Sequence, residues 1–143
     1  MACESSMGTR SQIFLQGAPE PEAFRPFGAA YGAAGILRSV KVLAAQGRCL
    51  LPADILAEHG LVPEAIAAGA DAGPVLRRLA GEGRALLAVA RTTRMPRTAI
   101  AAALPAVLAR RDFSRHDKGM ADGGPRGLGD RLAVVVAGLT GLL

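Results

Sequence analysis

The chain is poor in cysteine and in aromatic residues. Its 143 residues include two cysteines, one tyrosine, four phenylalanines and no tryptophan. Two thiols, Cys3 and Cys49, exclude a disulfide framework and a cysteine-based zinc pattern. With so few rings the chain has no platform on which the bases of a single-stranded nucleic acid would stack. We therefore predict no nucleic-acid partner, although the formal net charge is +5 and the pI is about 10.2.

Long apolar segments are also missing. The longest runs from Leu132 to Leu143 and is interrupted by Gly138, Thr140 and Gly141, whereas a helix that spans a bilayer needs about 20 residues. We interpret this segment as a core helix, with an interfacial helix as the alternative. The N-terminus lacks the basic stretch and apolar run of a secretory signal. We therefore expect a cytoplasmic protein, and peripheral contact with the inner face of a membrane stays open.

Proline and glycine divide the rest of the chain into segments with helical spacing of apolar residues. We predict an all-α fold with a polar, glycine-rich loop at about 112–129 and with Asp130 as the cap of a last helix. The segment 132–137 remains ambiguous between strand and helix. The predicted helices cover residues 22–46, 52–59, 63–68, 73–93 and 96–111.

The most informative segment is the predicted helix 22–46. Positions 28, 32, 35, 39 and 43 recur at spacings of three and four and therefore share one face. Two carboxylates at positions 39 and 43 would be one turn apart and could jointly hold Mg²⁺. The chain has Ser39 and Leu43 there, and glycine at the three earlier positions. We interpret this stripe as a small-residue face for close helix packing rather than as a ligand site.

This segment resembles the second aspartate-rich motif of the squalene/phytoene synthases, which reads roughly Q-x-x-N-I-L-R-D-x-x-E-D and is followed by G-R-x-Y-L-P. The chain retains Ile36, Leu37, Arg38, Gly47, Arg48, Leu51 and Pro52. At the polar and acidic positions of the motif it has Gly32, Gly35, Ser39, Val42 and Leu43. The resemblance implies part of an isoprenoid-synthase-like helical bundle. It assigns residues 17–143 to the C-terminal half of that bundle and leaves 1–16 as an unmatched, disordered tail.

The retained residues allow two interpretations each. Arg38 and Arg48 can bind a diphosphate, or they can pair with nearby carboxylates and fix the helix junction, which we favour because the metal ligands are missing. Tyr31 and Leu50 are the candidates for lining a prenyl cavity, and core packing is the alternative for Tyr31. The nearby carboxylates are Glu22, Asp54 and Glu58.

Within the family, this part of the chain is most similar to the branch that includes mitochondrial complex I assembly factor 6 and its bacterial relatives. The segments that carry this similarity are Leu37–Ser39, Gly47–Arg48, Leu51–Asp54 and His59–Gly60. That branch also lacks the aspartates. The resemblance implies a pseudoenzyme without a cofactor: a scaffold or assembly-type protein that binds a protein partner or a second copy through exposed apolar helix faces, with room for a prenyl ligand. The alternative is a head-to-head prenyl transferase, a squalene or phytoene synthase of isoprenoid biosynthesis, that uses Mg²⁺ and whose remaining catalytic half lies outside this chain.

Overall fold

Helices make up all the regular secondary structure in the described part of the chain, so the predicted all-α class is confirmed. The computed structural model describes residues 21–92, 100–120 and 125–141, and the side chains of residues 23–89 within the first range. Among these residues no helix is both long and apolar enough to cross a membrane. The elements are η1 (Pro21–Phe24), α2 (Arg25–Ala45), α3 (Ala53–Glu58), α4 (Pro63–Ala67), α5 (Gly73–Thr92), α6 (Ile100–Asp117) and α7 (Leu128–Thr140).

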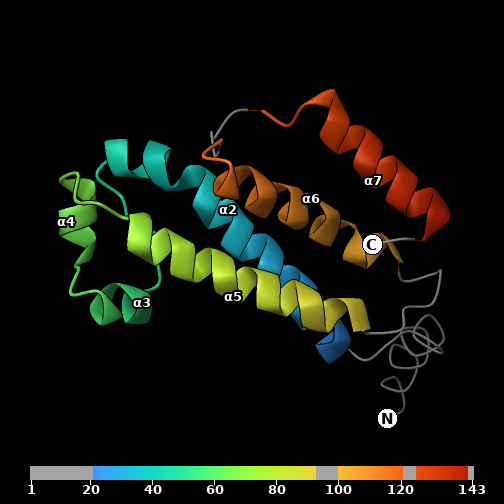
Figure 1. Cartoon of the computed structure of the whole chain (residues 1–143), viewed down its shortest axis with the longest axis horizontal. Helices are drawn as coiled ribbons and strands as arrows, with labels where there is room; N and C mark the ends of the chain where they lie inside the picture. The colour runs from blue at the N-terminus through green and yellow to red at the C-terminus, as the bar shows by residue number, and fades with distance from the viewer. Residues whose placement is uncertain (1–20, 93–99, 121–124, 142–143) are drawn as a thin grey trace, which may run out of the picture.

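Helix α2 is the centre of the bundle. It packs against both α5 and α6, while α7 packs on α6. Figure 1 shows the short helices α3 and α4 together at one end of α5, and α7 on the outer side of α6, away from α5. Three glycines with positive φ, Gly47, Gly60 and Gly69, follow α2, α3 and α4. Glycine adopts this left-handed conformation without the strain of a Cβ, so these helices end where the sequence predicts.

The core is built from small side chains with a few large anchors. Along α2 the buried residues include Phe27, Ala30, Ala34 and Leu37, at spacings of three and four. On α6 the buried side likewise combines small residues, Ala103, Ala106 and Ala109, with the fully buried ring of Phe113. Small residues allow two helices to approach closely, and the large rings then fill the remaining space at the density of a protein interior.

Gly83 on α5 permits a close contact between helices. A Cβ at this position would lie 2.2 Å from Cζ of Phe113 on α6. By contrast, a Cβ at Gly28, Gly32 or Gly35 would meet no atom within 4 Å. Our interpretation of the α2 stripe as a close-packing face is therefore wrong. The buried face of α2 is formed by alanine and larger apolar residues, and the glycines lie on its exposed side.

The C-terminal region differs from the predicted loop. Helix α6 continues through Asp112 to Asp117, and α7 begins at Leu128, so the connection is much shorter than 112–129. The segment 132–137 is helical, and residues 96–99 of the predicted fifth helix lie outside the described residues. Polar composition suggested a solvated loop, but Asp112 and Phe113 are both buried within α6. Asp130 does not cap α7, whose N-cap is Gly127 without a side-chain hydrogen bond.

Candidate functional site

The positions that correspond to the aspartate-rich motif form an apolar face on α2, hereafter the motif face (Gly32, Gly35, Ser39, Val42 and Leu43). Gly32, Gly35 and Val42 are exposed, and Ser39 and Leu43 are half-buried. The hydroxyl of Ser39 donates a hydrogen bond to the backbone carbonyl of Gly35 at 2.9 Å. This i to i−4 bond directs the only side-chain oxygen of the face back onto its own helix.

The other residues proposed from the motif do not gather into one cavity. Leu50 is 51 % exposed and Tyr31 is 40 % exposed. Arg126 lies over the ring of Tyr31, with Cζ 5.9 Å from the centroid. Arg48 is exposed in the turn after α2. Neither a prenyl-lining role for Tyr31 and Leu50 nor a diphosphate-binding role for Arg48 gains support from these positions.

Arg38 does enter a polar site, together with a carboxylate that the sequence did not suggest. Its Nη1 lies 3.5 Å from Oδ1 of Asp112 on α6, and the side chain of Asp112 is only 1 % exposed. Arg126 donates to both oxygens of Asp112, at 3.3 Å and 2.8 Å. Arg115 donates to Oδ1 at 3.1 Å. One buried carboxylate therefore ties α2, α6 and the connection before α7 together.

A second buried carboxylate, Asp130, fastens α7 to α6. Its Oδ1 accepts hydrogen bonds from Nε of Arg111 at 2.7 Å and from Nη2 of Arg115 at 2.6 Å. The side chain of Asp130 is 1 % exposed, and its Oδ2 has no partner within the described ranges. Arg115 thus bridges the two aspartates. We call these residues the ion-pair cluster: Asp112, Asp130, Arg38, Arg111, Arg115 and Arg126.

The arginines keep Asp130 ionised despite its burial. The hydrogen bond from Arg115, supported by that from Arg111, lowers the pKa of Asp130 from 3.8 to about 2, against the opposite effect of desolvation. The same bond to Asp130 raises the pKa of Arg115 above its ordinary value. A buried carboxylate that accepts charge-assisted hydrogen bonds has a depressed pKa for this reason. Asp130 is therefore ionised throughout the neutral range.

The residues present do not fit the Mg²⁺ that the resemblance to the family implies. Mg²⁺ binds carboxylate oxygens and water in near-octahedral geometry, and the motif face supplies no carboxylate. The buried carboxylates Asp112 and Asp130 face arginines, whose positive charges oppose a divalent cation. Across the parts of the chain that the structure describes, no group of three acidic, histidine or cysteine side chains could hold a metal ion.

Sequence reasoning missed the ion-pair cluster, although a signal was present. The polar stretch around Phe113 has helical spacing, because Arg115 follows Asp112 by three positions and Arg111 by four. A polar stretch with one large apolar residue was therefore compatible with a continuing helix. Asp130 lies too far along the chain for any local pattern to pair it with Arg111. Only the packing of α7 on α6 brings them together.

The comparisons with known proteins give one result. The model of the squalene/phytoene synthase family matches residues 8–127, which begins within the segment 1–16 that we left unmatched. No curated protein and no solved structure matches this chain. The family match covers well over half of the chain and includes α2, α5 and α6. The chain therefore belongs to the squalene/phytoene synthase family.

Proposed function

We propose that this chain is a non-catalytic member of its family that works as a scaffold or assembly-type protein. The observation that carries the proposal is the motif face, where serine, valine and leucine occupy the acidic positions of the motif and glycine occupies its two amide positions. Departure of a diphosphate group needs cations that neutralise the developing negative charge. On this face the one side-chain hydroxyl, that of Ser39, is bonded to its own helix, and nothing else there could recruit such a cation.

Exposed apolar helix faces support the scaffold role. On α7 the outward residues Leu132, Val135, Val136 and Leu139 recur at helical spacing and are 54–83 % exposed. Contiguous apolar surface of this kind commonly marks an interaction site. We propose that such faces bind a protein partner or a second copy of the chain. The same apolar faces also suit a prenyl ligand, or peripheral contact with the inner face of a membrane from the cytoplasm.

The resemblance of the segment from Leu37 to Gly60 to the complex I assembly branch supports a more specific version of the proposal. In that version the chain assists assembly of another protein close to a membrane, without a cofactor. The test of this version is a pull-down from cells with the full chain as bait, compared with a variant carrying Leu132→Glu and Leu139→Glu. Assembly-type binding predicts a discrete set of partners that the variant loses.

A second candidate is a head-to-head prenyl transferase, the activity for which the family is named. This function would require carboxylates from outside the 143 residues. The test is incubation of the protein with Mg²⁺ and with farnesyl or geranylgeranyl diphosphate, with an active squalene synthase as positive control. Our proposal predicts no squalene or phytoene above the level without protein. Mg²⁺-dependent product would establish the transferase instead.

A further inference from the structure

The outer side of α7 carries an apolar stripe, hereafter the α7 stripe (Leu128, Leu132, Val135, Val136 and Leu139). Its five side chains are 54–83 % exposed and lie within an arc of about 100° on the helix. Of the eleven exposed large apolar side chains in the described ranges, five thus belong to this one helix of 13 residues. A surface helix normally turns polar residues to water, so α7 has the composition of a helix that is covered on both sides.

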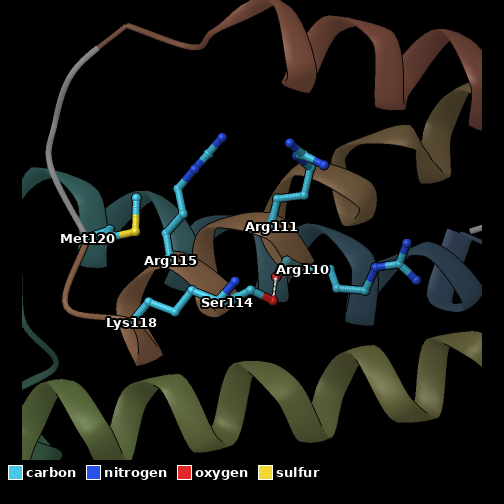
Figure 2. Close-up of a pocket in the computed structure, with 6 residues that line it drawn as sticks. All are labelled: Arg110, Arg111, Ser114, Arg115, Lys118 and Met120. Atoms are coloured by element: carbon cyan, nitrogen blue, oxygen red, sulfur yellow. Dashed lines mark hydrogen bonds between the residues drawn. The ribbon is translucent and has the colours of Figure 1, made fainter.

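Contacts on the inner side of α7 fix the direction in which the α7 stripe faces. Asp130 accepts hydrogen bonds from Arg111 and Arg115 of α6, and Figure 2 shows both arginines pointing from α6 toward α7. Ala137, two turns after Asp130 on the same side of the helix, is buried as well. Rotation of α7 about its axis would break these contacts, so the α7 stripe stays on the outer side of the bundle (Figure 1).

The spacing along the α7 stripe reads the same in both directions. Its members Leu128, Leu132, Val135 and Leu139 follow one another at four, three and four positions. This alternation is the spacing by which helices interlock in coiled coils. When a second α7 lies antiparallel, Leu132 of one copy meets Val135 of the other, and Leu128 meets Leu139. A two-fold interface requires such self-complementarity, because each contact occurs twice with the copies exchanged.

The charges of α7 favour a second copy over a membrane. Apart from the buried Asp130, Arg131 is the single charged residue of this helix, which also contains no aromatic residue. Amphipathic helices that bind membranes carry several lysines or arginines on a solvated polar face, whereas the inner side of α7 packs on α6. An antiparallel pair separates the two Arg131 positions by about 7.5 Å along the axis and opposes the helix dipoles. A parallel pair would set these like charges side by side.

We propose that the α7 stripe pairs antiparallel with the α7 stripe of a second copy of this chain and forms a two-fold dimer. This pairing rests on the proposed function, in which exposed apolar faces bind a partner, and names that partner. The paired stripes are about 17 Å long, so the interface is small and belongs with those of weak, reversible complexes. Because Leu132 and Val135 stand at its centre, a charge at either position would be buried without a partner when the dimer forms.

The test is sedimentation velocity of the full chain at concentrations from about 1 to 100 μM. The test variant is Leu132→Glu with Val135→Glu. The matched control is Leu50→Glu with Val62→Glu, which changes the same residue types at similarly exposed positions, 51 % and 55 %, outside α7. We expect the wild type and the control to dimerise as the concentration rises, and the test variant to dimerise at least about tenfold more weakly. Equal thermal midpoints at the lowest concentration would show that both variants fold.

Cysteine cross-linking tests the direction of the pairing. Leu132→Cys and Val135→Cys are made separately in a chain that carries Cys3→Ser and Cys49→Ala, and the two chains are mixed and oxidised. Antiparallel pairing brings position 132 of one copy beside position 135 of the other. Peptide mass spectrometry should therefore find more disulfides between positions 132 and 135 than between like positions. An equal or larger share between like positions would overturn the antiparallel arrangement.

Other molecules on the α7 stripe would give different results. A chain that stays monomeric at every concentration would overturn the dimer, as would equal weakening in the test and control variants. If the pull-down with Leu132→Glu and Leu139→Glu still identifies partners of such a monomer, the scaffold role stands and its partner is a different protein. If the monomer instead binds vesicles of phosphatidylcholine with phosphatidylglycerol, and the test variant does not, the stripe is a membrane contact. A dimer without pull-down partners would support the pairing and contradict the assembly role.

Discussion

The motif face of α2 and the ion-pair cluster between α6 and α7 use polar groups in opposite ways. The motif face carries no carboxylate and leaves Gly32 and Gly35 toward open space. The cluster buries two carboxylates, Asp112 and Asp130, and surrounds them with arginines from three parts of the chain. The two buried carboxylates of this protein therefore hold helices together, whereas the acidic residues of the family motif serve metal chemistry. This comparison predicts large stability effects at the cluster and small ones at the motif face.

Removal of the carboxylate of Asp112 should have the largest effect. Asp112→Ala leaves Arg38, Arg115 and Arg126 without their shared partner, and loss of one member of a buried ion pair destabilises a protein by about 3 to 5 kcal/mol. The arginines are 20–35 % exposed, so we expect about 3 kcal/mol. Urea unfolding measures it. Asp117→Ala, which breaks an exposed pair with Arg84, is the control and should change stability by at most about 1 kcal/mol.

Acidification should weaken the attachment of α7. The pKa of Asp130 is depressed to about 2 in the folded protein, so its stabilising contribution is present above pH 3.8 and is lost as the pH falls toward 2. A shift of this size corresponds to about 2 kcal/mol. Unfolding free energies measured from neutral pH to pH 2 should show this loss. In Asp130→Asn the pH dependence should be smaller by the same amount; an unchanged profile would contradict the assignment.

Gly83→Ala should overpack the contact between α5 and α6. The new Cβ would lie 2.2 Å from Cζ of Phe113, and overpacking of a close-packed core costs about 1 to 3 kcal/mol. The better helix propensity of alanine recovers up to about 1 kcal/mol of this. We expect a net loss of about 1 to 2 kcal/mol in thermal unfolding. Restored stability in the double variant Gly83→Ala, Phe113→Leu would show that the clash is the cause.

Gly32→Ala should have the smallest effect and the opposite sign. A Cβ at Gly32 meets nothing within 4 Å, so the change replaces a poor helix former without overpacking any neighbour. We expect stabilisation by up to about 1 kcal/mol. A lowered melting temperature would indicate that a second copy or another segment covers the motif face in solution. Sedimentation of the wild-type chain at several concentrations would identify a second copy as the cause.

The sequence predicts the parts of this fold that depend on local rules. Gly47, Gly60 and Gly69 mark helix ends because their positive φ values are a local requirement. The residues of the motif face can likewise be predicted, because their spacing places them on one side of a single helix. Local sequence does not determine whether Gly32 or Gly83 meets a neighbouring helix, because this contact depends on which sides of α2 and α5 are packed. We assigned close packing to the wrong glycine for this reason.

The ion-pair cluster escaped prediction for a related physical reason. A polar, arginine-rich stretch has the same composition whether it is a solvated loop or the charged side of a helix that faces another helix. Arg111 and Asp130 pair across 19 positions of sequence, and no periodic pattern reports such a pair. The buried Phe113 in the middle of the stretch was the available clue that α6 continues.

Mg²⁺ binding decides whether the motif face has lost its metal chemistry. The measurement is calorimetric titration of the wild-type chain with Mg²⁺, beside the variant Ser39→Asp with Leu43→Asp, whose two carboxylates stand one turn apart on α2. We expect no saturable binding of Mg²⁺ by the wild type and weak binding by the variant. Saturable binding of Mg²⁺ by the wild-type chain would contradict this expectation.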